Sequence, residues 1–407
     1  MRLSFLRVII MNITERFLKY VSFPTASDEF SETVPSTSKQ RVLGEYLTEE
    51  LKSIGVTDAV MDEYGYVYGS IKGNIDGAVG FVAHMDTSPD APDSPVKASV
   101  VEYNGGDIAL SDEVSITVKE FPFIENYKGQ RLIVTDGKTL LGADDKAGVA
   151  EIMSMCEYFI NNPEAPHKTI AVCFTPDEEI GRGADHFNYG LFAAKEAYTV
   201  DGGTLGEIEY ENFNAASARV DINGVIIHPG SAKNKMKNAA LYVQEFMSMM
   251  PQNEIPAATE GYEGFYHIHD IKANETEGEI RMIIRDHDRE KFESKKQFLV
   301  NLVSYLNSVH GEDTFKVEIK DSYYNMKEKI EPFMYLIENA KNAFSEAGVT
   351  PVTVPIRGGT DGARLSYEGL PCPNLSTGGE NFHSVREFIS VESLEKMTEV
   401  LIRLAEK

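Results

Sequence analysis

The segment AVGFVAHMDTSPD, residues 78–90, begins as an almost unbroken apolar run and ends abruptly in a group of polar residues. Residues 169–174 and 197–200 show the same pattern, ending in TPDEE and DGG respectively. Between these runs, residues 41–54 and 146–160 carry apolar side chains at helical spacing. Short buried strands that alternate with helices predict an α/β fold whose mixed sheet is mostly parallel.

A different order of elements occupies the middle of the chain. The pattern predicts the order β-α-β-β-α-β, at residues 218–227, 239–250, 265–273, 279–286, 289–309 and 314–320. This is the order of the ferredoxin-like unit. Because α/β character resumes after residue 324, we predict one domain formed by residues 12–213 and 324–407 and an inserted domain at residues 214–323.

The composition is that of a soluble globular protein, with 42% hydrophobic and 25% charged residues among 407. That length exceeds what one typical core requires, which favours two domains. Lysine and arginine number 39 against 64 aspartate and glutamate residues, and the formal net charge is −25. A field of this sign repels nucleic acids and anionic membranes, which bind through basic patches. We therefore expect neither as a partner.

Cysteine use and the N-terminal sequence indicate a cytoplasmic protein. Cys156, Cys173 and Cys372 lie far apart without a C-x-x-C pair, which argues against a disulfide framework and against a thiolate zinc site. No run is long and apolar enough to span a bilayer, and MRLSFLRVII lacks the h-region and cleavage site of a signal peptide. We expect residues 1–10 to be a non-functional extension ahead of Met11.

Histidine and acidic residues gather where the apolar strands end. The candidates are His84, Asp86, Asp144, Asp145, Glu178, Glu179 and Asp201, joined by His383 in the late loop GGENFHS. In open α/β sheets ligands bind beyond the carboxyl ends of the strands, so these side chains are expected to meet. Carboxylates and imidazoles without thiolates suit zinc, with manganese or cobalt as alternatives. A second carboxylate beside a ligand suggests hydrolysis, in which a metal activates water and the spare carboxylate moves the proton.

Each of these motifs also has a structural explanation of its own. His84 and Asp86 could form an ordinary polar strand end, and one of Asp144 and Asp145 could cap the helix that follows. The TPDEE motif could be a solvated acidic turn, although adjacent carboxylates repel one another unless a cation neutralises them. Four similar strand ends in one chain favour the metal site.

A set of segments spread along the chain forms a pattern known from one enzyme family. They are HMDTSPD (84–90), TDGKTLLGADDKAG (135–148), FTPDEEIGRGA (174–184), YTVDGG (198–203), ENFNAAS (211–217), HPGSAK (228–233), EGYEGFYH (260–267), IIRDHDR (283–289), DSYYNM (321–326), PIRGGTDGARLS (355–366) and LPCPNLSTGG (370–379). Together they closely resemble the peptidase T family, the tripeptide aminopeptidases among the co-catalytic dinuclear zinc metallopeptidases. The H-x-D and D-E-E motifs occur across that superfamily, whereas EGYEGFYH, DSYYNM and PIRGGTDGA are specific to the subfamily.

The resemblance implies two zinc ions per subunit. Its ligand positions fall on His84, Asp144, Glu179, Asp201 and His383. His84 and Asp201 would share one ion. Glu179 and His383 would share the other, and Asp144 would bridge both.

The same resemblance implies residues that act on the substrate. Glu178 would be the general base, which takes a proton from water and later gives it to the leaving amine. Asp86 would clamp the neighbouring histidine ligand. The inserted domain would serve as a lid and as the surface of a homodimer, with His228 reaching across the dimer to steady the oxyanion. Arg285 and Arg357 would contact the substrate, Arg285 through a peptide carboxylate.

Two other functions compete with a tripeptide aminopeptidase. A deacylase or carboxypeptidase would use the same metal site, although the lid and loop segments favour the aminopeptidase. A peptide-binding scaffold that has lost catalysis would lack a ligand or the base, yet none of these residues is missing. We therefore expect a cytoplasmic enzyme that removes the N-terminal residue from short peptides, chiefly tripeptides, through attack by zinc-activated water.

Overall fold

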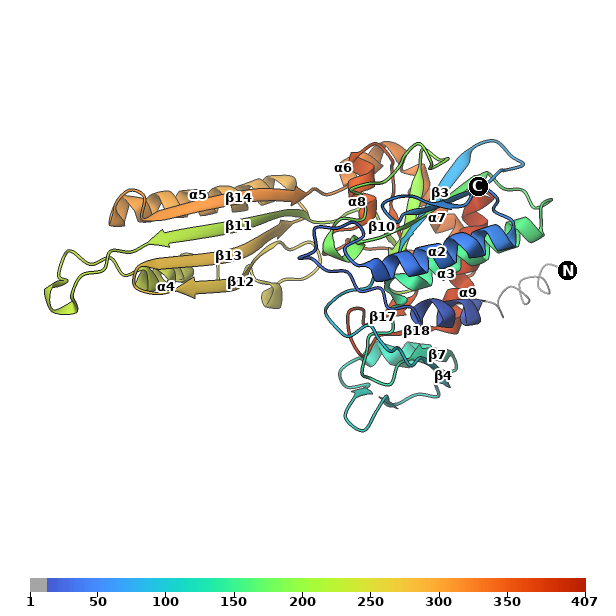
Figure 1. The fold of residues 1–407 in the computed structure, drawn as a ribbon, viewed down its shortest axis with the longest axis horizontal. Coiled ribbons are helices and arrows are strands. Elements are labelled where there is room, and N and C mark those ends of the chain that lie inside the picture. The colour runs from blue at the N-terminus through green and yellow to red at the C-terminus, as the bar shows by residue number, and fades with distance from the viewer. Residues whose placement is uncertain (1–12) are drawn as a thin grey trace. The chain divides into compact units, whose positions relative to one another are not determined.

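The computed structural model describes residues 13–407, and the extension expected ahead of Met11 lies outside the described residues. The chain forms two compact units (Figure 1). The first holds the described residues up to Tyr210 together with Glu328–Val354 and Thr360–Lys407. The second holds Glu211–Lys327 and the separate segment Pro355–Gly359. No pattern in the sequence indicates that this late segment belongs to the second unit.

The first unit is built on an eight-stranded sheet. Its strands, in spatial order, are β1 (Val60–Met61), β2 (Val67–Ile71), β8 (Thr169–Thr175), β3 (Ala78–His84), β9 (Ala197–Gly202), β16 (Asn374–Ser376), β10 (Glu207–Glu209) and β15 (Val352–Thr353). The four central strands, β8 to β16, run parallel, whereas β2 and β10 join them antiparallel. The sheet is therefore mixed with a parallel centre, which confirms the predicted fold class.

Helices cover this sheet and bring polar residues to the ends of its strands. They are a helix at 13–21, α2 (Ser38–Ile54), α3 (Ala143–Asn161), α7 (Tyr335–Glu346), α8 (Asp361–Tyr367) and α9 (Val391–Ala405). Helix α3 packs against β3, β9 and α9, and its apolar stripe, which includes Val149, Ile152 and Cys156, is fully buried. The seven residues of β3 are buried except for Ala78, which explains why its sequence is a continuous apolar run.

A second, smaller sheet was not predicted. Its order is β17-β18-β7-β4, formed by β4 (Ser99–Glu102), β7 (Arg131–Val134), β17 (Gly379–Glu380) and β18 (Phe388–Ser390). A hairpin of β5 (Ile108–Ala109) and β6 (Ser115–Ile116) and a 3-10 helix, Pro122–Tyr127, belong to the same region, whose core includes Tyr103, Ile124 and Phe388. This sheet matters to the site because β17 and β18 flank the loop that carries His383.

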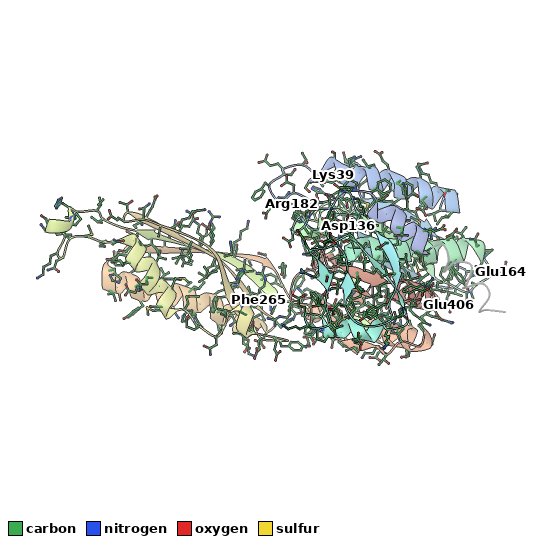
Figure 2. All side chains as sticks on the ribbon, turned by 90° about the horizontal axis from the view of Figure 1, so that it is seen from below. Lys39, Asp136, Glu164, Arg182, Phe265 and Glu406 are labelled. Atoms are coloured by element: carbon green, nitrogen blue, oxygen red, sulfur yellow. The ribbon has the colours of Figure 1, made fainter. Side chains whose placement is uncertain are left out.

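The second unit has the predicted order β-α-β-β-α-β. Its elements are β11 (Asn214–Asn223), α4 (Ala239–Met249), β12 (Phe265–Ala273), β13 (Glu277–Asp286), α5 (Arg289–His310) and β14 (Phe315–Tyr323). The strands form an antiparallel sheet in the order β12-β13-β11-β14, with the aromatic ring of Phe265 at the start of β12 (Figure 2). Side chains of α4 and α5, among them Phe246 and Phe292, fill the core beside this sheet.

Several strand bounds of the second unit differ from the prediction: β11 begins at Asn214 and not at residue 218, and β14 runs to Tyr323 and not to residue 320. Strand β11 ends at Asn223, whereas the apolar residues after it predicted a strand as far as residue 227. The N–H of Gly224 donates to the carbonyl of Thr276 at 2.7 Å, and Val225 and Ile226 are exposed.

Among residues 13–407, no helix has the length and apolarity needed to cross a membrane.

Candidate metal centre

The five predicted ligand side chains come from separate elements of the first unit. His84 ends β3, Asp201 lies in β9, and Glu179 lies in the 3-10 helix (Glu178–Ile180) that follows β8. Asp144 stands in the first turn of α3, and His383 in the loop between β17 and β18. Because β8, β3 and β9 are parallel neighbours, their carboxyl ends bring three of these residues to one edge of the sheet.

Asp144 lies between the two histidines. Its Oδ1 is 2.8 Å from Nε2 of His84, and its Oδ2 is 3.2 Å from Nε2 of His383. Nε2 of His84 also lies 3.2 Å from Oδ1 of Asp201, and Nε2 of His383 lies 3.0 Å from Oε2 of Glu179. Nε2 of each histidine thus faces two carboxylate oxygens, one of which belongs to Asp144.

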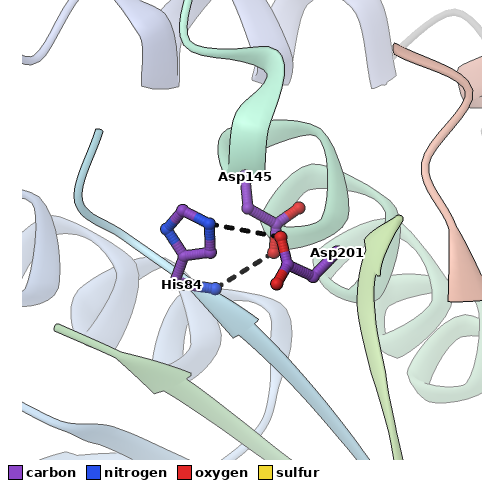
Figure 3. A group of neighbouring side chains, drawn as sticks. All are labelled: His84, Asp145 and Asp201. Carbon is purple, nitrogen blue, oxygen red and sulfur yellow. Dashed lines mark hydrogen bonds and ion pairs between the residues drawn. The ribbon is translucent and has the colours of Figure 1, made fainter. Parts of the chain in front are cut away.

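The second aspartate of the pair has a different environment. Figure 3 shows Asp145 and Asp201 beside His84, and the ligand atoms of these three residues lie within 4.8 Å of one another. One oxygen of Asp145 accepts from the main-chain N–H of His84 at 3.0 Å, and the other accepts from that of Gly148 at 3.1 Å. Both oxygens are therefore engaged by the backbone, and Asp145 fixes the end of β3 against the start of α3.

The electrostatics of the cluster show an excess of buried negative charge. Burial, reinforced by Asp144, raises the pKa of Glu179 to about 7, and burial raises the pKa of Asp201 to about 6. Hydrogen bonds with Asp144 and Glu179 raise the pKa of His383 to about 11. Although burial opposes it, hydrogen bonds with the two histidines lower the pKa of Asp144. These shifts favour the binding of protons by the cluster, and a bound cation would neutralise the same carboxylates in their place.

The residues of the cluster fit zinc. Two imidazole nitrogens and three carboxylates, with no thiolate, form a donor set that zinc accepts. The ligand atoms of His84, Asp144 and Glu179 also lie within 4.8 Å of one another. Among the described residues, nothing hydrogen-bonds to the buried Oε1 of Glu179. A buried polar atom without a hydrogen-bond partner destabilises the folded state by roughly 1–3 kcal/mol, unless a cation takes the place of the missing donor.

Asp86 contacts both the first histidine and the acidic turn. Its Oδ1 lies 3.4 Å from Nδ1 of His84, and its main-chain oxygen lies 3.1 Å from the same atom. The carboxylate accepts the main-chain N–H of Glu178 at Oδ1, 3.0 Å, and that of Glu179 at Oδ2, 3.2 Å. The contact with the turn was not predicted from the sequence. Burial, followed by the charge of Asp201, raises the pKa of Glu178 well above its usual range.

Glu387 holds the start of α3 and was not predicted as a site residue. Its buried carboxylate accepts the main-chain N–H groups of Leu141 at 2.7 Å, Gly142 at 2.8 Å and Asp144 at 3.1 Å. An anion is favoured at this position because the N–H groups of the first helical turn have no partner within the helix. Since His383 precedes Glu387 in the same loop, one segment contributes a histidine to the cluster and anchors Asp144. Its only signal in the sequence is a single glutamate directly before the apolar strand FIS.

Two predicted substrate residues, His228 and Arg285, belong to the second unit. His228 is exposed on a turn, where its Nδ1 accepts the N–H of Gly230 at 3.2 Å. Arg285 is half-buried and donates from Nη1 to the carbonyls of Ile284 at 3.0 Å and Ala216 at 3.3 Å. The cluster described above is built from the first unit alone.

The third, Arg357, binds a loop of the second unit. Its Nη1 donates to the carbonyls of Gly261 at 2.6 Å and Glu263 at 3.1 Å, and its Nη2 donates to the hydroxyl of Thr259 at 3.1 Å. The guanidinium also lies 5.1 Å from the ring centre of Phe213. These contacts give Arg357 a structural task, which is to hold the segment from Thr259 to Glu263.

Comparisons with known proteins identify the family. The sequence model of the family described as peptidase family M20/M25/M40 matches residues 127–407. Peptidase T of Alkaliphilus oremlandii is 52% identical over 403 residues, which cover 97% of this chain and 98% of the relative. Peptidase T of Halothermothrix orenii is 51% identical over 400 residues, with the same two coverages.

Solved structures share the fold. The aminopeptidase PepT of Bacillus cereus superposes with a TM-score of 0.76 at 23% identity, and a tripeptidase of Staphylococcus aureus with 0.77 at 20% identity. A dinuclear metal-binding M20 peptidase of Bacillus subtilis gives 0.65 at 14% identity. Each comparison covers 98% of both chains. The chain therefore belongs to the M20/M25/M40 family of peptidases, as its resemblance to the peptidase T family implied.

Proposed function

We propose that this peptidase is a dinuclear zinc aminopeptidase that removes the N-terminal residue from tripeptides. The observation that carries the proposal is the position of Asp144, whose two oxygens lie 2.8 and 3.2 Å from Nε2 of His84 and of His383. A carboxylate placed in this way suits two adjacent cations. The names of the relatives, peptidase T and, for one structural neighbour, tripeptidase, support the substrate class.

Two sets of residues would hold the ions. His84 and Asp201 would hold one, Glu179 and His383 would hold the second, and Asp144 would give one oxygen to each. When bound, zinc lowers the pKa of a water molecule and polarises the carbonyl of the scissile peptide.

Glu178 is the proposed general base. Asp86 binds the main-chain N–H groups of both Glu178 and Glu179. With the turn fixed in this way, the first of the two carboxylates would be free to act as the base and the second would be a ligand. As the water oxygen bonds to the peptide carbonyl carbon, a water proton passes to a carboxylate oxygen of Glu178. The C–N bond then breaks while Glu178 returns the proton to the leaving amine nitrogen. The products are a free amino acid and a dipeptide, and Glu178 is restored.

The second unit is proposed to act as a lid and as the surface of a homodimer. The partner subunit's His228 would donate a hydrogen bond to the oxyanion, a task for which an exposed imidazole on a turn is suited. Arg285 would bind the peptide carboxylate. For Arg357, the contacts with residues 259–263 support a role in shaping the loop, in addition to the proposed contact with substrate. We place the enzyme in the cytoplasm.

The test measures the amino acid released from an unblocked tripeptide, its N-acetylated form, a dipeptide and a tetrapeptide. We expect rapid cleavage of the unblocked tripeptide alone, lost on chelation and restored by zinc. Glu178→Ala should abolish this activity, whereas Glu164→Ala, at an exposed glutamate of the same unit (Figure 2), should leave it unchanged. Equal turnover of the N-acetylated peptide would instead assign a deacylase or carboxypeptidase to the same site.

Sedimentation of the active enzyme tests the homodimer separately. A fully active monomer would remove the role proposed for the partner subunit's His228 and leave the metal site unaffected.

A further inference from the structure

We propose that Asp177, Gln40 and Ser36 form a positioning network that sets the direction of the Glu178 and Glu179 side chains. The inference rests on the proposed function, which makes Glu178 the base and Glu179 a ligand. All three network residues belong to the first unit and are buried, with exposed fractions of 1%, 0% and 6%.

Asp177 has an unusual backbone conformation. Its φ is 59°, in the left-handed region, at the point where β8 turns into the 3-10 helix Glu178–Ile180. Non-glycine residues adopt this conformation at a cost, and a buried one persists only where its surroundings fix it. Asp177 itself is therefore held by specific contacts, and it determines how the chain enters the acidic turn.

Those contacts come from the start of α2 and the loop before it. The main-chain N–H of Ser36 donates to one carboxylate oxygen of Asp177 at 2.7 Å, and the Ser36 hydroxyl donates to the other at 2.6 Å. Gln40 Nε2 donates to that second oxygen at 2.6 Å, while Gln40 Oε1 accepts the main-chain N–H of Asp177 at 3.1 Å. Gln40 thus binds both the side chain and the backbone of Asp177, which leaves Asp177 little freedom to rotate.

The network completes a pattern along the turn. The N–H of Asp177 is accepted by Gln40, and the next two N–H groups, of Glu178 and Glu179, are accepted by the two oxygens of Asp86. Three consecutive backbone donors are therefore bound by side chains from other parts of the chain. Because Asp86 also lies 3.4 Å from Nδ1 of His84, the turn is fixed relative to the first histidine. Groups held in this way are pre-organised for reaction, and a shift of about 1 Å can cost about 100-fold in rate.

The same hydrogen bonds also stabilise the fold, so a loss of stability alone does not separate positioning from structure. A positioning role predicts a fall in kcat with little change in KM, together with weaker binding of the ion that Glu179 holds. A purely structural role predicts a lower Tm with normal kinetics in the molecules that remain folded.

The experiment compares Asp177→Gly and Gln40→Leu with the parent enzyme. Glycine tolerates the left-handed conformation, so Asp177→Gly removes the carboxylate without adding backbone strain. We expect kcat for the tripeptide to fall by about 10- to 100-fold in both variants, with KM within about twofold. Chelator competition on the zinc-free chain should show one of the two ions bound about tenfold more weakly. The control is Asp313→Gly, at an exposed aspartate with φ of 62°, which should match the parent in every measurement.

A double variant shows whether the network acts through the base. At saturating zinc, Asp177→Gly in the Glu178→Ala background should lower the residual rate by less than about twofold, because the base that Asp177 directs is absent and saturating zinc offsets the weaker binding of the ion that Glu179 holds. A full additional loss would overturn the proposal, as would normal kcat and normal zinc affinity in both single variants. If Glu178→Ala were itself fully active, the proposed base would be wrong, which is a failure distinct from normal kinetics in the Asp177 and Gln40 variants.

Discussion

Asp86→Asn tests the contact between the first histidine and the acidic turn. Each oxygen of Asp86 accepts one main-chain N–H, from Glu178 at 3.0 Å and from Glu179 at 3.2 Å. An asparagine amide keeps one acceptor oxygen but no charge, so the variant loses one of these hydrogen bonds outright and keeps the other only as a weaker, neutral bond. A charge-assisted hydrogen bond contributes about 1.5–3 kcal/mol. If the loss falls on the transition state, kcat decreases by roughly 10- to 150-fold, at about 1.36 kcal/mol per tenfold.

Comparison with Asp86→Ala makes the magnitude a sharper test. Alanine removes both acceptors, which doubles the loss to about 3–6 kcal/mol and lowers kcat by roughly 10² to 10⁴-fold. Both variants keep the main-chain oxygen of Asp86 at 3.1 Å from Nδ1 of His84, so the histidine retains a partner. We therefore expect the ion held by His84 to stay bound in Asp86→Asn.

The assay is steady-state tripeptide hydrolysis combined with the measured zinc content of each variant. Asp76→Asn, at an exposed aspartate of the same unit, serves as the control and should match the parent. Equal kcat values for Asp86→Asn and Asp86→Ala would refute the assignment of the two oxygens to two separate N–H groups. Loss of zinc with unchanged rate per bound ion would show that Asp86 acts on His84 alone.

Three further outcomes are expected. Burial raises the pKa of Glu209 from 4.5 to about 8, so the folded state binds a proton at Glu209 more tightly than the unfolded state does. The contribution of Glu209 to the stability of the fold is therefore greatest below about pH 4.5 and is lost as the pH rises through 8. Thermal melts of Glu209→Gln should show a Tm that depends less on pH over that range. Arg16, 7% exposed, binds Glu50 at 2.7 Å and Glu157 at 2.8 Å, so Arg16→Met should cost about 3–5 kcal/mol in urea unfolding with kcat unchanged; a loss below 1 kcal/mol would mean that both carboxylates find other partners. Chelation should lower the Tm, because ions that bind only the folded chain stabilise it, and the shift should shrink in Asp144→Ala; an equal shift in that variant would place the stabilising ions elsewhere.

Much of the architecture was predictable because burial imposes a pattern on the sequence. Strand β3 lies in the parallel centre of the sheet, so its residues are apolar without alternation and its end is marked by a sudden change at His84. Asp144 and Asp145 come just after Gly142 and Ala143 and precede a helical apolar stripe, which predicted that they lie at the start of α3. In both places the polar residues of the site stand next to a buried apolar segment, and the change from apolar to polar residues is visible in the sequence.

The small sheet could not be predicted in the same way. Strand β17 has two residues, β18 has three, and β4 and β7 have four each, which leaves little room for a period-2 pattern. These strands form because aromatic residues such as Tyr127 and Phe388, far apart in the sequence, pack together. Such contacts are invisible to any local window.

The residues that hold the site in place were missed for a related reason. Glu387 and Gln40 belong to no motif that indicates a role in the site, since each acts on main-chain N–H groups that any residue could supply. The sequence shows which side chains can bind a metal ion. The residues that hold those side chains in position are defined by tertiary contacts, which the sequence does not show. Arg357 is the opposite case. Its motif predicted a contact with substrate, and the structure shows that its side chain also binds a loop of the second unit.

The location of His383 in the chain has a consequence for the timing of activity during synthesis. The other four proposed ligands lie at or before Asp201, whereas His383 follows the whole of the second unit and joins a sheet whose strand β7 was made much earlier. A growing chain can fold its first strands and bring His84, Asp144 and Asp201 together before His383 exists. On the ribosome, an incomplete copy would therefore lack the second ion's histidine. If the proposed ligand assignment holds, a peptidase made in this order would stay inactive towards the peptides around it until nearly all of its own chain has been translated.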